Sequence, residues 1–398
     1  MEKKKFISEI DRYKKILNIE SFDDFLSGSV LYNYLKDNKS LEFLDEFYSL
    51  LFLYGNLSFL DNNALDEIIK SLVPTAQKHG AEGSAEEIDN EYNVSFATSV
   101  NMVVKFVKTF YPEYLKHFMD IMNNRFYITK EKNSVYNSVL DSVSVYDSNS
   151  IATCYVLIHE LIHSENGGDT SIYNWTSEVP SYAIEFFFND FIKGYYKKLI
   201  KDSNLWMRAR LADDVETLCG YIFMKKFKKL IDDNNPVNKD SINELLGSIT
   251  SEFGIHEVYV ISSVEKFFYV VKSYEDAKNS VEDEEIKDIT VKEYKKTFLS
   301  KHEKGKAMRD ALLEGNRLVI KCSEHAIGSA LGFKLYQNMF DNDFDTEEFI
   351  NINANIHNLS VDDLLNILSL KDKNGYNKDE LNNMKEAFQM RLKRLEDE

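Results

Sequence analysis

The segment Ile151–His163 reads IATCYVLIHELIH and ends in an H-E-x-x-H pentapeptide at the close of an apolar run. The eight residues before His159 contain no proline or glycine, so the run predicts a mostly buried helix that continues into the motif. On such a helix His159 and His163 are four residues apart and project from one face, where both imidazoles can hold one zinc ion. Glu160 lies beside that face and can take a proton from a water molecule at the metal without being a ligand. The pattern predicts the zinc site of a hydrolase, and the alternative is a pair of hydrogen-bonded core histidines.

A catalytic zinc needs a third protein ligand, and two glutamates downstream compete for that role. The stretch Ser164–Ser177 is rich in Gly, Asn, Ser and Thr and predicts a loop that ends the first helix. The next residues, EVPSYAIEFFF from Glu178, have helical apolar spacing, and Pro180 is tolerated there only in a first helical turn. We expect Glu178, at the start of this second helix, to be the third ligand. Glu185 lies seven positions later on a similar face and is the competing candidate. Its alternative role is to orient one of the metal ligands by a hydrogen bond, without binding the metal itself. Two further carboxylates near the loop are interpreted as solvated: Glu165 and Asp169.

Around these segments the chain resembles the thimet oligopeptidase and oligoendopeptidase F family of gluzincin peptidases. That family pairs H-E-x-x-H with a downstream E-x-P-S helix that carries the glutamate ligand, and the match here is EVPS from Glu178, with Glu185 at the place of the family's later helix glutamate. Upstream, Ser134–Tyr146 is similar to the family's edge strand and Asp147–Ile158 to its approach to the zinc helix. The resemblance implies a helical zinc-peptidase fold with a small β edge beside the active site, and short peptides or unfolded segments as substrates. An exposed edge strand would hold an extended peptide by main-chain hydrogen bonds.

The chain departs from the family pattern in several places. Only fourteen residues separate His163 from Glu178, fewer than is usual in the family, and the chain is shorter than typical members. The family's C-terminal helix carries a histidine and tyrosines that assist the tetrahedral intermediate, and His325 and Tyr336 are the corresponding candidates here. These two lie eleven residues apart on one face of a predicted helix, from which they would stabilise an oxyanion; the alternative is a hydrogen-bonded core pair. Gly332-Phe333 stands where the family usually has Gly-Tyr, so one assisting hydroxyl is missing from the pattern.

Composition excludes some classes of partner. A formal net charge of −18 argues against nucleic acid and anionic membranes as main partners. No apolar run is long enough for a membrane span, and Met1–Ile10 turns polar too soon for a signal peptide. We therefore expect a cytoplasmic protein, with secretion without a signal peptide as the open alternative. The cysteines are too few and too scattered for a disulfide framework or a thiolate zinc site: Cys154, Cys219 and Cys322.

Helical spacing dominates the rest of the chain, so the predicted fold class is mainly α. Only four prolines and fifteen glycines interrupt the sequence, and most segments between them show apolar residues at i, i+3 and i+4. One stretch, Ser134–Val145, has the alternation of a β-strand. Helices are expected near 178–202, 205–231, 239–253, 257–274 and 303–340. We expect three consecutive regions: an N-terminal helical region and possible lid at 1–90, a zinc-peptidase core at 91–342 and a C-terminal helical hairpin at 343–398.

These patterns predict a metalloprotease in which one zinc ion, held by His159, His163 and Glu178, acts with Glu160 to hydrolyse peptide bonds. The HELIH spelling and the chain length also resemble clostridial neurotoxin light chains, which would make the protein a toxin-like zinc endopeptidase for one folded protein. That family's glutamate ligand lies much further downstream, and it has no E-x-P-S helix at this distance. A third hypothesis is a catalytically silent module that keeps the peptidase fold and captures a peptide. The expected partner is a peptide substrate, and the sequence does not indicate an oligomeric state.

Overall fold

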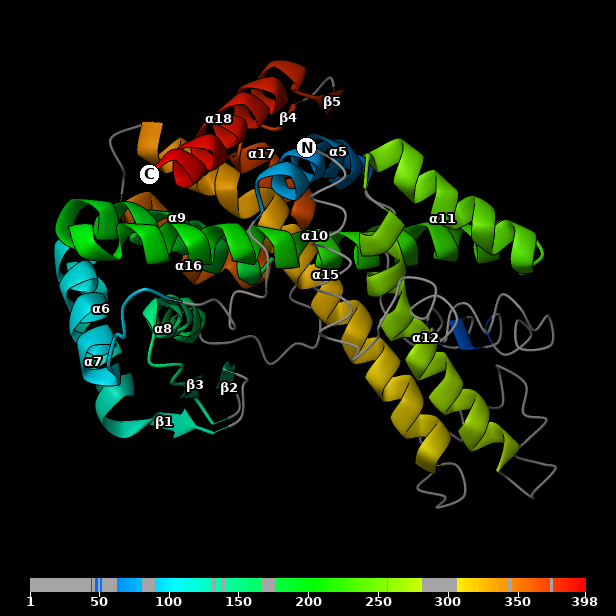
Figure 1. The fold of residues 1–398 in the computed structure, drawn as a ribbon, viewed down its shortest axis with the longest axis horizontal. Coiled ribbons are helices and arrows are strands. Elements are labelled where there is room, and N and C mark those ends of the chain that lie inside the picture. The colour runs from blue at the N-terminus through cyan, green and yellow to red at the C-terminus, as the bar shows by residue number, and fades with distance from the viewer. Residues whose placement is uncertain are drawn as a thin grey trace. The chain divides into compact units, whose positions relative to one another are not determined.

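The computed structural model of the chain is mainly helical, as the sequence predicts (Figure 1). The chain forms two compact units. Unit 1 comprises Met1–Asp66 and Val215–Ser323, and unit 2 comprises Glu67–Asp214 and Glu324–Glu398. The residues that the structure describes are 44, 47, 48, 51, 63–80, 90–130, 134–137, 140–165, 176–255, 257–280, 306–341, 346–372 and 375–398. Most of the expected lid at 1–90 and most of the expected loop Ser164–Ser177, including Asp169, lie outside them.

The two units interleave along the sequence, because each takes its residues from two separate stretches of the chain. Helix α10 (Ile200–Asp232) begins in unit 2 and ends in unit 1, and α15 (Lys306–Asp341) runs from unit 1 into unit 2. Apolar periodicity shows that such a helix continues but not which core each part of it joins. The shorter helical elements outside the site are α5 (Asn63–His79), η3 (Pro112–Tyr114), α7 (Leu115–Asn124), η4 (Lys197–Leu199) and η6 (Ile356–Asn358).

A three-stranded sheet in unit 2 packs against the motif helix. Its strand order is β1 (Phe126–Thr129), β3 (Ser142–Tyr146), β2 (Val135–Asn137), with β1 parallel and β2 antiparallel to β3. Val143 and Val145 alternate with more polar residues along β3 and are both 0% exposed, so one face of the central strand enters the core.

The β-like stretch predicted over Ser134–Val145 is therefore two strands joined by a turn. The backbone N–H of Leu140 donates to Asn137 Oδ1 at 3.0 Å, and Asp141 takes a φ of 45°, which together reverse the chain. Strand β1 was not predicted. Its four residues do not alternate between buried and exposed positions, so period-two spacing could not reveal it.

Helix α8 (Ile151–Glu165) is the predicted motif helix. The hydroxyl of Ser150 accepts the N–H of Ala152 at 3.2 Å, which satisfies a donor at the start of the helix. α8 packs against β2, β3, α6 (Phe96–Phe110) and α9 (Glu178–Tyr195), and twelve of its residues are buried. A helix enclosed on most sides needs apolar residues all round, which explains why its sequence has no polar stripe.

Helix α9 begins at Glu178, the residue expected to start the second helix. Pro180 lies in its first turn, where a backbone N–H would have no partner within the helix. Just before the helix, the Thr176 hydroxyl donates to the Ile356 carbonyl at 2.8 Å, and the N–H of Val179 donates to the Thr176 carbonyl at 3.1 Å. The chain thus enters α9 from a fixed point, and Glu178 is held at the N-terminal end.

Helix α15 approaches α9 closely at two glycines one turn apart. A Cβ on Gly328 would lie 2.5 Å from the Cβ of Glu178 and 2.8 Å from Cδ2 of Tyr182, and a Cβ on Gly332 would lie 2.5 Å from the Cβ of Tyr182. Only glycine fits where a backbone lies this close to a neighbouring side chain. The two glycines bring this part of α15 against the first turns of α9.

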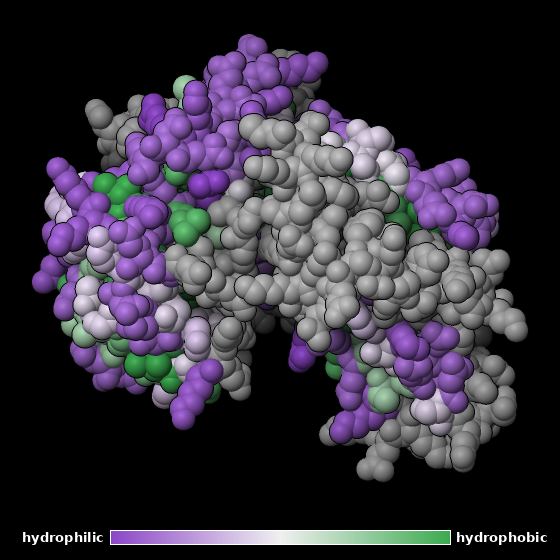
Figure 2. Space-filling view, viewed as in Figure 1, coloured by the Kyte–Doolittle hydropathy of each residue, from purple (hydrophilic) through white to green (hydrophobic). Residues whose placement is uncertain are grey.

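The C-terminal part of unit 2 contains three helices and a short β-hairpin: α16 (Thr346–Asn355), α17 (Val361–Ile367), β4 (Lys371–Asp372), β5 (Gly375–Tyr376) and α18 (Lys378–Asp397). α18 buries one stripe, formed by Met384, Phe388, Leu392 and Leu395. Its exposed side is hydrophilic (Figure 2), so α18 is amphipathic. None of the helices in the described ranges is both long and apolar enough to cross a membrane.

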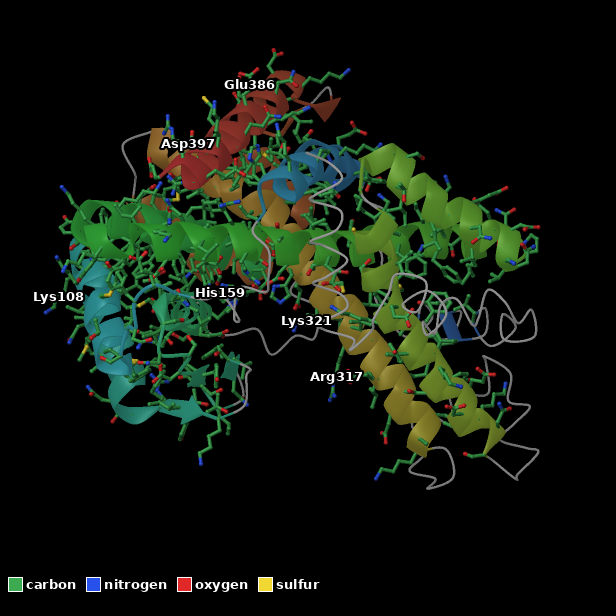
Figure 3. All side chains as sticks on the ribbon, viewed as in Figure 1. Lys108, His159, Arg317, Lys321, Glu386 and Asp397 are labelled. Atoms are coloured by element: carbon green, nitrogen blue, oxygen red, sulfur yellow. The ribbon has the colours of Figure 1, made fainter. Side chains whose placement is uncertain are left out.

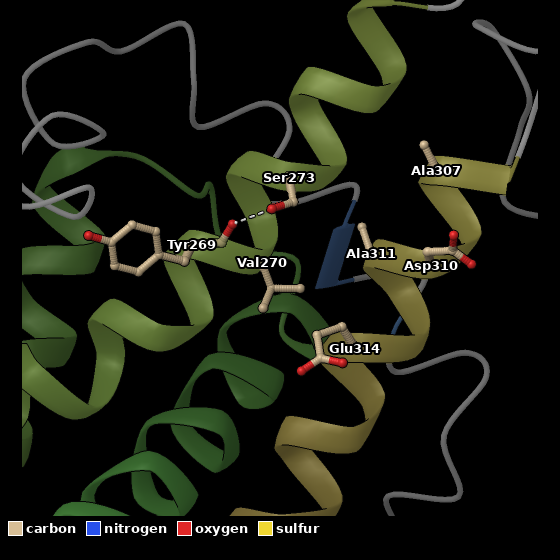
Figure 4. A pocket seen from close by; sticks show the side chains of 7 residues that line it. All are labelled: Tyr269, Val270, Ser273, Ala307, Asp310, Ala311 and Glu314. Carbon is tan, nitrogen blue, oxygen red and sulfur yellow. Dashed lines mark hydrogen bonds between the residues drawn. The ribbon is translucent and has the colours of Figure 1, made fainter. Parts of the chain in front are cut away.

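Unit 1 has an aromatic core built from α10, α12 (Glu257–Asn279) and two residues near the N-terminus, Phe47 and Tyr48. Helix α11 (Lys239–Phe253) packs against α12. The rings of Tyr48 and Phe227, for example, have centroids 4.3 Å apart. A pocket of about 440 Å³ lies between α12 and α15 in this unit (Figure 4). Its lining has no histidine or cysteine: Tyr269, Val270, Ser273, Ala307, Asp310, Ala311 and Glu314.

Candidate metal centre

His159 and His163 point toward each other from consecutive turns of α8, and Figure 3 shows His159 among the packed side chains of unit 2. Their Nε2 atoms are 3.1 Å apart. His159 is only 8% exposed, so it is a core residue rather than a surface histidine. The four-residue spacing has brought both Nε2 atoms to one point, as the motif predicts.

Glu178 completes the group from the first turn of α9. Its Oε2 lies 3.1 Å from His159 Nε2, and its Oε1 lies 3.2 Å from His163 Nε2. The ligand atoms of these three residues all lie within 4.8 Å of one another, so they can hold a metal ion. Among the described residues, no other set of three or more His, Cys, Asp or Glu side chains brings its ligand atoms this close together.

The hydrogen bonding around Glu178 also fits a cation. Glu178 Oε2 is buried and accepts no hydrogen bond from any described residue, although two imidazoles lie close to it. A buried carboxylate oxygen left without a donor is costly, and a bound cation would satisfy it. Burial raises the pKa of Glu178, but the nearby His325, His163 and His159 outweigh it and hold that pKa well below its usual range.

Glu185 occupies the opposite side of the His159 ring. Its Oε1 lies 2.7 Å from His159 Nδ1, the nitrogen that faces away from His163 and Glu178. Of the two glutamates left open by the sequence, Glu178 belongs to the convergent group and Glu185 orients the ring from outside it. Burial lowers the pKa of His159, but the nearby carboxylates of Glu178 and Glu185 outweigh it and raise that pKa to about 10.

Glu160 lies next to the group without belonging to it. Its side chain is buried, and its Oε2 accepts the backbone N–H of Tyr136 on β2 at 2.6 Å. The sheet therefore fixes the direction of this carboxylate. Burial raises the pKa of Glu160, while the charges of His159 and His163 oppose the shift. A carboxylate with a raised pKa suits a group that accepts and returns a proton.

His325, one member of the expected oxyanion-stabilising pair, lies next to the group. Its Nδ1 is 3.7 Å from Glu178 Oε2 and 3.2 Å from the hydroxyl of Tyr182. The Tyr182 hydroxyl donates to Asp214 Oδ1 at 2.8 Å, and the guanidinium of Arg210 lies over the Tyr182 ring at 4.5 Å. Arg210 Nε is also 3.7 Å from Glu185 Oε2, so a positive charge lies behind the His159–Glu185 pair.

Tyr336, the other member of the expected pair, does not lie at the group. Its hydroxyl donates to Asp190 Oδ2 at 2.6 Å, and Asp190 is twelve residues after Glu178 on α9, about 18 Å along the helix. His325 and Tyr336 do share a face of α15, but eleven residues of helix separate them by about 16 Å. A shared face therefore cannot bring both to one metal.

Several residues around the group were missed by the sequence analysis. Tyr182 is four residues after Glu178, so the helical spacing of α9 could have placed it on the same face. Arg210 and Asp214 come from α10, and Tyr136 comes from β2. Nothing local in the sequence marks these three, because tertiary packing alone brings them here. Glu165, interpreted as solvated, is partly buried instead, 3.5 Å from His117 Nε2, and burial raises its pKa to about 7.

Comparisons with known proteins give no match: no protein-family model, curated protein or solved structure matches the chain. Function must therefore be inferred from the residues and the geometry of the site.

Proposed function

We propose that this chain is a zinc-dependent peptidase in which His159, His163 and Glu178 hold the metal and Glu160 is the general base. The observation that carries the proposal is the convergence of the two Nε2 atoms and the Glu178 carboxylate, with a second buried carboxylate beside them. Two histidines and a glutamate are a ligand set of catalytic zinc, which keeps one position open for water or substrate.

The separations of the ligand atoms support zinc. In a tetrahedral site with bonds of about 2.0–2.1 Å, neighbouring ligand atoms lie roughly 3.3 Å apart. The separations here are 3.1 Å between the two Nε2 atoms and 3.1 and 3.2 Å from these nitrogens to the carboxylate. Glu185 on His159 Nδ1 is the carboxylate–histidine contact that orients metal-binding imidazoles.

The chain's own residues divide the chemistry between them. Zinc in this site would polarise the scissile carbonyl and lower the pKa of a water molecule bound to it. Glu160, aimed by its bond from the Tyr136 N–H, would accept the proton of the attacking water and pass it to the leaving amine. His325 remains the candidate of the predicted pair that can contact a substrate beside Glu178.

The sheet offers a place for an extended substrate. β2 pairs with β3 on one side, and no strand of the described residues pairs with its other side. Tyr136 on β2 is bonded to Glu160, so a peptide added to this edge would run past the proposed base. The family resemblance favours short peptides or unfolded segments as that substrate.

A peptide-library digest analysed by mass spectrometry tests the proposal. The protein is stripped with a chelator, reloaded with one equivalent of zinc and incubated with short peptides and with folded proteins. Zinc-dependent cleavage of the peptides but not of the folded proteins is the expected result. Selective cutting of one folded protein would favour the toxin-like endopeptidase, and peptide binding without zinc or cleavage would favour the silent module. Either outcome contradicts the oligopeptidase assignment.

A further inference from the structure

Asp214 is a buried carboxylate that the proposed chemistry does not use. It is 2% exposed on α10 and accepts two hydroxyl hydrogen bonds, from Tyr182 at 2.8 Å and from Ser329 at 3.1 Å. Burial raises its pKa to about 7, although Arg210 opposes the shift. Tyr182 belongs to α9 and Ser329 to α15, so Asp214 joins the two helices that carry Glu178 and His325.

The position of one proton follows from these bonds. A phenol has a single proton, and Tyr182 gives it to Asp214 when that carboxyl group is ionised. Toward His325 Nδ1, 3.2 Å away, the Tyr182 oxygen can then only accept, so Nδ1 carries a hydrogen. The same Nδ1 is 3.7 Å from the buried Glu178 Oε2, which accepts no hydrogen bond from the described residues.

The geometry points to Asp214 and Tyr182 as positioning residues that hold the proton of His325 on Nδ1 and fix the orientation of its ring against Glu178. This inference rests on the proposed function in so far as His325 serves a peptidase site. Because a neutral ring with a proton on Nδ1 has its lone pair on Nε2, neutral His325 accepts a hydrogen bond at Nε2 and cannot donate one there. Its role toward substrate in that state is to receive an N–H, such as that of the peptide or of the leaving amine. Stabilising an oxyanion would require the imidazolium form.

We call the hydrogen-bond chain from Asp214 through Tyr182 to His325 Nδ1 the relay. Nitrogen NMR of histidine tautomers in the zinc-loaded protein tests it. The chain has eight histidines, and His325→Gln identifies the signal of His325 by its loss. In the wild-type protein this signal should report a proton on Nδ1. Tyr182→Phe removes the acceptor and keeps the ring, so the Nδ1 preference should be lost. Tyr336→Phe removes another tyrosine hydroxyl bonded to an aspartate, and it should leave His325 unchanged. A wild-type proton on Nε2, or an unchanged His325 signal in Tyr182→Phe, would overturn the relay.

Asp214 variants separate the hydrogen bond from the charge. Asp214→Asn keeps an oxygen that accepts from Tyr182, so it should retain the Nδ1 proton, whereas Asp214→Ala should lose it. In both Tyr182→Phe and Asp214→Ala, kcat/KM on the peptide library should fall roughly 10–100-fold with zinc content unchanged. Wild-type cleavage matched by both variants overturns the relay alone. A wild-type protein that neither binds zinc nor cleaves peptides overturns the proposed function instead, and the same NMR comparison on the metal-free proteins then decides the hydrogen-bond chain.

Discussion

His159 lies between two glutamates that use its two ring nitrogens differently. Nε2 faces Glu178 and His163, and Nδ1 faces Glu185. The sequence could predict the two histidines and Glu160 because their spacing on one helix fixes their faces. It could not decide between Glu178 and Glu185, since seven residues are nearly two full helical turns and leave both on one face of α9. Which glutamate lies beside the two histidines depends on how α9 is placed along α8, and the sequence does not show this.

Replacing each glutamate separately tests this assignment. Glu178→Ala removes one of three proposed protein ligands and should abolish stoichiometric zinc binding. Glu185→Ala removes the partner of His159 Nδ1 and should weaken zinc affinity only about 10–100-fold. Zinc titration with a competing chelator measures both. Loss of zinc in Glu185→Ala with retention in Glu178→Ala would reverse the assignment.

Zinc binding should release a proton. The raised pKa of His159, about 10 without metal, leaves its ring charged at pH 7.5, and a ring that coordinates zinc through Nε2 while hydrogen-bonded to Glu185 must be neutral. Because His159 must lose a proton to bind zinc, the apparent zinc affinity should rise with pH and level off as the pH passes the pKa of His159. Calorimetry at pH 7.5 in buffers of different ionisation heat should show release of roughly one proton per zinc. Binding with no net proton release would contradict the charged state of His159.

At the scale of elements, the sequence could predict long helices, but it could not predict a short strand, a tight turn or the place where two helices meet. Apolar spacing predicted α8 and the start of α9, but it expected the break before α10 at 203–204, whereas α9 ends at Tyr195 and α10 begins at Ile200. β1 is too short for its spacing to be read, and the turn at Asp141 divides what looked like one strand. Tyr336 was misplaced because spacing gives the face of a helix but not the distance along it. The close approach of α15 to α9 appears in the sequence only as Gly328 and Gly332, four residues apart.

Adding a methyl group at Gly328 tests that approach. In Gly328→Ala the new Cβ would meet Glu178 Cβ at 2.5 Å, so the helices must separate. We expect the free energy of unfolding to fall by about 1–3 kcal/mol. Zinc affinity should fall with it because Glu178 shifts.

The matched control is Gly247→Ala in the middle of α11, where an added Cβ meets nothing within 4 Å. This change should raise stability by about 0.5–1 kcal/mol through helix propensity and leave zinc binding unaltered. Urea denaturation and zinc titration of the two variants give the comparison. Equal stability and zinc affinity in both would show that the close contact does not matter.

At the scale of the whole molecule, the sequence predicted a helical protein, which the structure confirms. Unit 2 takes its residues from two separate stretches, and the second includes the C-terminal helices. Arg391 on α18 connects that stretch to α9: its guanidinium donates to Asp190 and, at 2.7 Å, to Asn189 Oδ1. Such long-range pairs leave no periodic signal.

Arg391→Met should destabilise the protein because it removes the guanidinium that donates to Asn189 Oδ1 and pairs with the Asp190 carboxylate, which keeps its hydrogen bond from Tyr336. Arg391 is only 10% exposed, so we expect a loss of roughly 2–4 kcal/mol, below the full cost of breaking a buried pair because Asp190 is partly exposed. Arg394→Met, on the exposed side of the same helix, should change stability by no more than about 0.5 kcal/mol. Thermal and urea unfolding measure both. Equal effects would show that α18 does not depend on this contact.

The most direct test of the account is a comparison of wild-type protein and Glu160→Gln, with zinc content and peptide turnover measured on the same samples. The glutamine keeps an oxygen that can accept the Tyr136 N–H, so the side chain stays in place, but it can no longer take a proton. The account predicts one zinc in each protein and turnover lower in Glu160→Gln by at least roughly 10²–10⁴-fold. Full zinc occupancy with undiminished turnover in Glu160→Gln would contradict it.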